Sequence, residues 1–258
     1  MILYHGQPNG PSFAVLAALE ECGLDIECRP IDLLAGERHA IPGIRERVAL
    51  DMAVEGEGPV LVRDGEAMTE SVFLAQFFDE EAGGGRLQPK DPYARWQMMM
   101  WCRQVTERLA PAVALLGNLA HSRRRLAAME EQAFAALTAK IASDDLRARW
   151  SALRNDEPDE AQVADSEGKI EQFADRIEDQ LADGREWLMG SFSIADLETY
   201  GWMAPAANLK PAAAQGRPRL TQWLERVSAR DGVRAALARA SGNRREAFAP
   251  GPEINRWG

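Results

Sequence analysis

The pair Glu70-Ser71 has the residue types and the position of a binding site for a small charged ligand. Ser71 stands where an apolar helical pattern begins, so its hydroxyl and the unpaired backbone N–H groups of the first turn would face an anion. A carboxylate suits such a position, and the neighbouring Glu70 can receive an ammonium group. The pair therefore predicts a site for a zwitterion, with an ordinary helix cap at Ser71 as the alternative.

Further donors and cations lie earlier in the chain. Asn9 lies in the Gly- and Pro-rich segment 5–11, and Ser12 stands at the start of an apolar helical pattern. Either side chain can donate a hydrogen bond to an anion, although capping is an alternative role for Ser12. Basic residues that could pair with a carboxylate, or be ordinary surface residues, are Arg38, His39, Arg45 and Arg47.

Several functions are disfavoured by composition. Cys22, Cys28 and Cys102 form no CxxC spacing, and the three histidines form no HxxxH spacing, so we expect inert thiols, no disulfide framework and no metal site. The net charge of −10 argues against a nucleic acid partner. No stretch approaches the roughly 20 consecutive apolar residues that span a membrane. The first residues read as a strand and not as a leader, so we expect a cytoplasmic protein.

The elements that would position these residues begin with a strand–helix–strand pattern. Residues 1–5 read as a short strand, and residues 13–19 read as a helix that Ser12 can cap and Gly23 ends. Residues 26–31 alternate as a half-buried strand, and Pro30 favours a place at the sheet edge.

A hairpin and a helix follow the irregular stretch 33–57. Asp64-Gly65 between two apolar runs predicts a tight turn, and the next helix begins at Ser71 and ends near the glycines at 83–85. The order predicts an α/β domain with a mixed four-stranded sheet over residues 1–82.

Strand signals are absent after residue 91, and residues 92–258 are expected to form an all-helical domain behind a linker at 82–92. A long helix begins near Pro92, Pro111 should kink it, and a break is expected near residues 154–158. The charge runs between 121 and 185 read as solvated helix faces. The sequence Ser193-Ile194-Ala195-Asp196 is a capping box, and the apolar tail 248–257 is expected to pack back on the domain.

Taken together, the motifs resemble the glutathione transferase superfamily over essentially the whole chain. The segments that carry the resemblance are Pro8-Asn9-Gly10, Gly58-Pro59, Thr69-Glu70-Ser71 and Ser193-Ile194-Ala195-Asp196. Within the superfamily, the helical insertion with Arg149-Trp150-Ser151-Ala152-Leu153-Arg154-Asn155 resembles the bacterial β-aryl etherases that cleave lignin-derived ethers. The resemblance implies a thioredoxin-like N-terminal domain with a glutathione site.

The resemblance also implies residue roles. Glu70 and Ser71 would hold the γ-glutamyl end of glutathione. Asn9, in a motif like that of the Asn-using relatives, or Ser12, in the serine region of the etherases, would donate a hydrogen bond to the thiolate. The basic residues, Arg38 and His39 foremost, would pair with the glycyl carboxylate.

Pro59 is similar to the family's cis-proline, which lets the preceding backbone pair with the cysteinyl part of glutathione. The chain departs from the family here, because Gly58 replaces a common valine and Ala53-Val54 replaces a common Asn-Pro. The loop 54–58 is acidic, and two carboxylates near an anionic tripeptide should weaken its binding.

The resemblance implies an enzyme in which the glutathione thiolate displaces an aryloxide from a small aromatic substrate. The substrate would lie between the domains, against Trp96, Met99, Met100 and Arg103, although a stripe with this spacing can simply be core. Two alternatives stay open: a glutathione-dependent disulfide reductase, and a non-catalytic subunit of a heterodimeric transferase. A dimer, with itself or with a related chain, is expected from the family.

Overall fold

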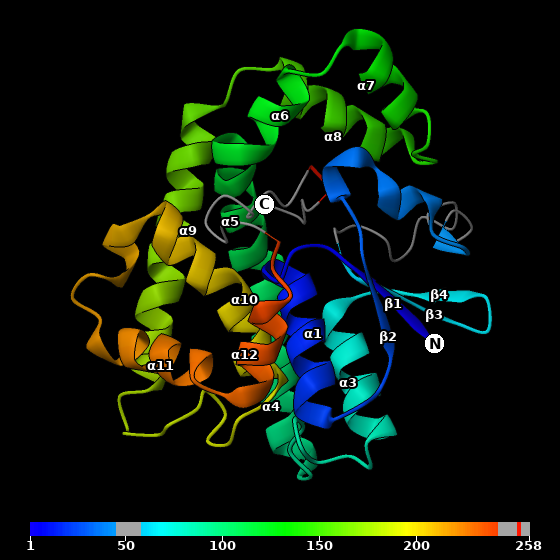
Figure 1. The fold of residues 1–258 in the computed structure, drawn as a ribbon. Coiled ribbons are helices and arrows are strands. Elements are labelled where there is room, and N and C mark those ends of the chain that lie inside the picture. Colours follow the sequence, from blue (N-terminus) through cyan, green and yellow to red (C-terminus); the bar gives the residue numbers. More distant parts are fainter. Residues whose placement is uncertain (45–57, 242–251, 254–258) are drawn as a thin grey trace.

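The computed structural model describes residues 1–44, 58–241 and 252–253 (Figure 1). Arg45, Arg47 and residues 53–57 of the acidic loop region lie outside these ranges.

The N-terminal part builds a four-stranded sheet in the order β2-β1-β3-β4. β1 (Ile2–His5) is parallel to β2 (Glu27–Pro30) and antiparallel to β3 (Val60–Arg63), and β3 pairs with β4 (Glu66–Met68) in an antiparallel hairpin. Pro30 lies on the edge strand, where its missing N–H costs no ladder hydrogen bond. Asp64 and Gly65, with φ of 52° and 85°, form the predicted turn. The predicted mixed sheet is confirmed.

α1 (Gly10–Cys22) crosses between β1 and β2, and it begins before Ser12. Asn9 is the N-cap residue, and its carbonyl accepts the Phe13 N–H at 3.2 Å. The prediction that Ser12 caps the helix is therefore wrong, because Pro11 already suits a first helical turn. Gly23 ends the helix in the left-handed conformation, with φ of 67°, as predicted.

α3 (Ser71–Glu81) begins at the predicted residue and leads into glycines 83–85, all with positive φ. After it, α4 (Pro92–Gln104) passes through a π-helical turn (Val105–Leu109) into α5 (Ala110–Gly117). Pro111 cannot donate to the carbonyl of the preceding turn, so the helical ladder widens next to it, where a kink was predicted. A second π turn (Asn118–Ser122) leads into α6 (Arg123–Ala127).

The rest of the described chain is helical. It contains α7 (Glu131–Thr138), α8 (Asp144–Asn155), α9 (Glu160–Gln180), α10 (Ile194–Leu209), α11 (Pro218–Ser228) and α12 (Asp231–Ala238), with short 3-10 turns at Leu33–Ala35 (η1), Glu37–Ala40 (η2) and Pro211–Ala214 (η5). The break between α8 and α9 falls where it was predicted. None of the helices in the described ranges combines the length and apolar character needed to cross a membrane.

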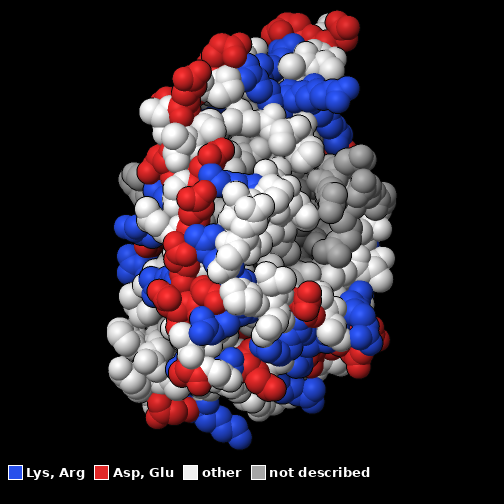
Figure 2. Space-filling model, turned by 90° about the vertical axis from the view of Figure 1, so that its left-hand side faces the viewer, with Lys and Arg blue, Asp and Glu red and all other residues white. Residues whose placement is uncertain are grey.

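The acidic residues of α9 form a solvated face, as the charge pattern predicted. Asp175 pairs with Arg217 at 2.7 Å, and Glu167 and Glu171 share Lys210 at 2.8 and 2.9 Å. Figure 2 shows a column of acidic side chains on the side of the molecule where α9 lies in Figure 1. The carboxylates of these pairs are exposed to solvent, so we expect each pair to contribute less than about 1 kcal/mol to stability.

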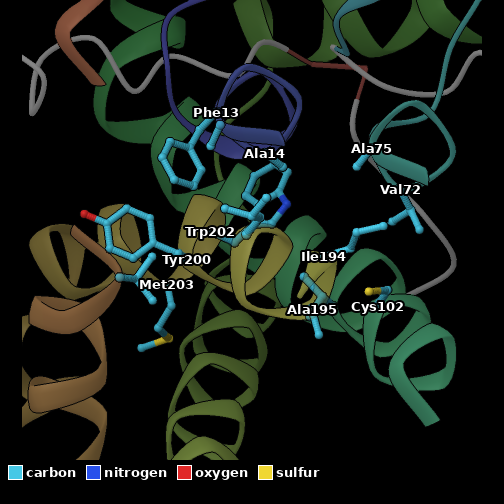
Figure 3. Close-up of a cluster of buried hydrophobic side chains, with 14 of the residues drawn as sticks. Phe13, Ala14, Val72, Ala75, Cys102, Ile194, Ala195, Tyr200, Trp202 and Met203 are labelled. Carbon is cyan, nitrogen blue, oxygen red and sulfur yellow. The ribbon is translucent and has the colours of Figure 1, made fainter. Parts of the chain in front are cut away.

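α10 is the centre of the main hydrophobic core. Phe13 of α1 packs on Tyr200 of α10, with ring centroids 4.9 Å apart, and Val72 of α3 and Cys102 of α4 belong to the same cluster (Figure 3). A Cβ atom at Gly201 would lie 2.6 Å from the Gly10 carbonyl oxygen, so only glycine permits this approach of α10 to α1. Because this core joins the sheet to the helices, the domain division at 82–92 stays a prediction.

A second core joins the α7–α8 hairpin to the sheet. Trp150 of α8 and Leu137 of α7 pack in one buried cluster with Leu34 of η1 and Val60 of β3. Asp32 also accepts a hydrogen bond from Arg125 at 3.0 Å. The inserted hairpin therefore lies directly against the segment that contains Arg38 and His39 (Figure 1).

Candidate functional site

Ser71 lies at the N-terminus of α3 with its side chain buried, and the residue before it is strained. Glu70 has φ of 72°, a conformation that residues with a side chain rarely adopt. Such strain costs of order 1–3 kcal/mol and is concentrated at functional sites. The local backbone thus has the form of a preorganised site, with the first-turn N–H groups of α3 available to an anion.

Glu198 of α10 faces this helix start and was missed by the sequence analysis. It is fully buried, and neither carboxyl oxygen makes a hydrogen bond of normal geometry within the described residues. Burial raises the pKa of Glu198 to about 8, although the Ser71 hydroxyl lowers it in part and the Glu70 charge raises it further. At neutral pH the Glu198 carboxyl is therefore mostly protonated and uncharged. It adds no negative charge beside the anion site at the start of α3.

The start of α1 rests on the same helix. A Cβ atom at Gly10 would lie 3.2 Å from the Trp202 ring, one helical turn along α10 from Glu198. Residues four apart on a helix share a face, so one face of α10 supports the N-termini of both α1 and α3. Figure 3 shows Trp202 between the α1 side chains and those of α3. The two groups of candidate residues around Asn9 and Ser71 are thereby held in a fixed relation.

In the loop before α1, Ser12 is engaged with the backbone. Its Oγ accepts the Gly6 N–H at 3.0 Å, and its side chain is almost fully buried. The hydroxyl hydrogen is still available for donation to an anion. Asn9 is half-buried and makes no capping hydrogen bond to α1. The roles of Asn9 and Ser12 toward a thiolate stay a prediction.

Gln7 of the same loop is held by a residue from the end of the chain. The Gln7 amide Nε2 donates to Ser241 Oγ at 2.6 Å, and the Ser241 N–H donates to Gln7 Oε1 at 2.9 Å. The chain beyond α12 therefore passes the β1–α1 loop.

Pro59 does not have the expected cis peptide bond, since the described residues contain none. The expectation is wrong for this chain. An X–Pro bond favours trans by about 0.5–1 kcal/mol unless its surroundings select cis, and Gly58 brings no side chain with which to select it. Both residues are buried beside β3.

Arg38 and His39 are brought together, and both contact a carboxylate of the protein itself. Arg38 Nη1 donates to Glu253 Oε2 at 3.4 Å, and His39 Nε2 lies 2.5 Å from Glu253 Oε1. Trp150 Nε1 also donates to Glu253 Oε1, at 3.0 Å, and Arg149 Nη1 donates to the Glu253 backbone carbonyl at 2.9 Å. Glu253 is only 2% exposed, so the predicted packing of the tail is confirmed at this residue.

The contacts around Glu253 favour its charged form. Burial acts to raise the pKa of Glu253, but the hydrogen bond from His39 and the charge of Arg38 outweigh it, and the pKa lies below its ordinary value. The side chains around Glu253 therefore form a site that stabilises a charged carboxylate. The sequence analysis proposed Arg38 and His39 as partners of a carboxylate because they are basic. It named Arg149 and Trp150 in the etherase-like motif but assigned them no role.

None of the residues predicted to form the aromatic wall on α4 is fully buried. Trp96 is 55% exposed and stacks on Tyr93, Arg103 is exposed, and Met99 and Met100 are half-buried. The buried residues of α4 are Met98, Trp101 and Cys102. A hollow of about 540 Å³ lies instead between α5, α8 and α9. Its lining includes Pro111, Leu115, Leu119, Arg149, Val163 and Pro252. Through Arg149 and Pro252 this hollow adjoins the Glu253 cluster.

Two predicted supporting features behave as expected. The Ser193 N–H donates to Asp196 at 3.0 Å in the capping box of α10, and Trp223 Nε1 also donates to Asp196, at 2.9 Å. The thiols are free, and burial raises the pKa of Cys22 to about 11 and that of Cys102 well above its usual value. None of the thiols is therefore a ready nucleophile at neutral pH.

The comparison with protein families matches the helical part of the chain. Residues 130–231 match the family described as "Glutathione S-transferase, C-terminal domain". The C-terminal part of the chain is thus similar to the C-terminal domain of glutathione S-transferases and follows a four-stranded mixed sheet, so the recognised resemblance is confirmed.

Among individual proteins, the chain is 26% identical to Protein LigF of Sphingobium sp. (strain NBRC 103272 / SYK-6) over 243 residues, which cover 90% of this chain and 91% of LigF. The crystal structure of the β-etherase LigF superposes with a TM-score of 0.77 at 23% identity, covering 93% of this chain and 99% of that one. A glutathione transferase from Burkholderia graminis, crystallised with two glutathione molecules per subunit, superposes with a TM-score of 0.63 at 20% identity, covering 92% and 87%.

Proposed function

We propose that this chain is a glutathione-dependent transferase that cleaves an aryl ether of a small aromatic substrate, as the likeness to LigF suggests. The observation that carries the proposal is the support of two helix N-termini, those of α1 and α3, on one face of α10. Together with Arg38 and His39, these provide separate places for the two carboxylates of glutathione. Glutathione is the proposed co-substrate.

The proposed roles follow from the chemistry of each group. The Ser71 hydroxyl and the first-turn N–H groups of α3 hold the γ-glutamyl carboxylate, and Glu70 receives the ammonium group. Arg38 and His39 pair with the glycyl carboxylate. Asn9 or Ser12 donates to sulfur, which stabilises the thiolate relative to the weakly nucleophilic thiol. We give Pro59 only a packing role. The backbone of Gly58 keeps its proposed role of pairing with the cysteinyl part of glutathione, provided that glutathione can approach the trans Gly58–Pro59 peptide.

In the reaction, the thiol loses its proton to solvent and the sulfur attacks the carbon that carries the aryloxy group. A C–S bond forms while the C–O bond breaks, and the aryloxide leaves with the bonding electrons and takes up a proton. We place the aromatic substrate in the hollow between α5, α8 and α9, where apolar residues such as Pro111, Leu115 and Val163 form about half of the lining and polar or charged residues form the rest.

The test is calorimetric titration with glutathione, followed by turnover of a β-aryl ether measured as released phenol. Binding with turnover, both lost in Ser71→Ala, supports the proposal. Binding without ether cleavage, but with reduction of a glutathione mixed disulfide, would favour the disulfide reductase alternative. Absence of both would refute the enzymatic proposal.

One observation favours a second candidate, a non-catalytic subunit of a heterodimeric transferase. The carboxylate site at Arg38 and His39 is filled by the chain's own Glu253. A chain that serves only as a partner has no need of an open site. Co-purification with a related, active transferase chain, together with no glutathione binding by this chain alone, is the result that this candidate predicts.

We also propose a cytoplasmic dimer, built through α3 and α4. Phe73, Tyr93 and Trp96 are large apolar residues with 61%, 65% and 55% of their surface exposed. Aromatic residues of this kind are enriched in protein interfaces. Light scattering should give twice the chain mass, and Trp96→Glu should shift the measured mass toward that of the monomer. The mass of the natural complex then shows whether the partner is an identical chain.

A further inference from the structure

The carboxylate site at Arg38 and His39 is assembled from parts of the fold that are independent of the tail. Arg38 and His39 belong to η2, whereas Arg149 and Trp150 belong to α8, and the second core holds these elements together. Glu253 is joined to them only through the chain end, 215 positions from Arg38. The site therefore exists as a cradle, and Glu253 is an occupant that another carboxylate can replace.

The same stretch of chain is attached at a second candidate element. Ser241, just beyond α12, makes two hydrogen bonds with Gln7 in the loop that carries Asn9. The chain end is thus anchored on one side at the proposed thiolate loop and on the other at the proposed glycyl-carboxylate site. Both anchors involve elements to which the proposed function assigns glutathione.

We propose that Glu253 is an intramolecular competitor of glutathione: its side chain stands in for the glycyl carboxylate, with Trp150 as a third donor to whichever carboxylate is bound. This inference rests on the proposed function. Glutathione must displace the tail, so its apparent dissociation constant is the intrinsic one divided by the fraction of molecules whose tail has left.

The size of the effect follows from the tether. A competing group that is covalently linked to its site acts at an effective concentration of order millimolar. A tail whose own dissociation constant is tenfold lower than that concentration leaves about one molecule in ten open. We therefore expect Glu253→Ala to bind glutathione about tenfold more tightly than the wild-type chain. γ-Glutamylcysteine, which lacks the glycyl carboxylate, should gain clearly less.

The experiment is calorimetric titration of the full-length chain with both ligands, for wild type, Glu253→Ala, and Glu225→Ala as an exposed control with the same charge change. Tighter glutathione binding in Glu253→Ala alone supports the inference. Equal binding by wild type and Glu253→Ala would overturn it while leaving the proposed function intact. Absence of binding by both would overturn it together with the proposed function.

A second variant and a second measurement distinguish displacement of the tail from misfolding of Glu253→Ala. Glu253→Gln keeps the shape of the side chain but removes its charge, and it should show the same direction of change. In the wild-type chain, glutathione should increase hydrogen exchange in the peptide that contains residues 252–253. Unchanged exchange at saturating glutathione would show that the tail stays in place and would overturn the inference.

Discussion

Replacing Glu198 with glutamine should remove a large pH dependence of stability. The pKa of this buried carboxyl is about 8, against an ordinary value of 4.5, so between these pH values the folded chain holds a proton that the unfolded chain has lost. The free energy of unfolding therefore falls as pH rises through this window. At about 1.36 kcal/mol per pH unit in the middle of this window, the loss from pH 5 to pH 8 is about 3.5 kcal/mol.

Glutamine cannot ionise. The free energy of unfolding of Glu198→Gln, relative to that of the wild-type chain, should therefore rise progressively from pH 5 to pH 8 by up to that amount. Urea unfolding at pH 5, 6, 7 and 8 measures the gain, with Glu225→Gln as an exposed control. Asp196, whose pKa burial raises to about 6, and the other ionisable groups are present in both chains, so their contributions cancel in the difference. Parallel stability curves for Glu198→Gln and wild type would refute the assignment of a protonated Glu198.

Four further substitutions, one of them a matched control, test other parts of the structure. Gly201→Ala should cost about 1–3 kcal/mol, because its methyl group meets the Gly10 carbonyl, whereas Gly168→Ala, in an open helical position, should gain up to about 1 kcal/mol; urea midpoints compare them. Trp150→Phe removes a donor to Glu253 and should lower the free energy of unfolding by about 1.5–3 kcal/mol, and an unchanged urea midpoint would contradict that contact. Ser12→Ala leaves the buried Gly6 N–H without its partner and should cost about 1–3 kcal/mol; a fall in kcat at unchanged glutathione affinity would add a role at sulfur.

The parts of the fold that depend on local chemistry were predictable from the sequence. Asp64-Gly65 specifies a tight turn by its tolerance of positive φ, Gly23 ends α1, and an apolar pattern with a serine before it sets the start of α3. The capping box of α10 is equally local. Ser12 misled the prediction because Pro11 allows the helix to begin earlier.

The contacts that define the candidate site were beyond sequence reasoning, since they join distant positions. Glu253 and Arg38 are 215 positions apart, and the pattern of the tail indicated packing without indicating a partner. Glu198 is a charged residue beyond the capping box of a mostly apolar helix, a signal that could have been used, but its neighbour Ser71 is known only from the packing of α10 on α3. The isomer at Pro59 depends on its surroundings, so the motif could not fix it.

A crystal structure of the chain with glutathione tests the account most directly. We expect the γ-glutamyl end at Ser71, the glycyl carboxylate on Arg38, His39 and Trp150, and Glu253 displaced from its present contacts. Crystals soaked at saturating glutathione in which Glu253 still fills the cluster, with no tripeptide at the start of α3, would contradict the proposed site.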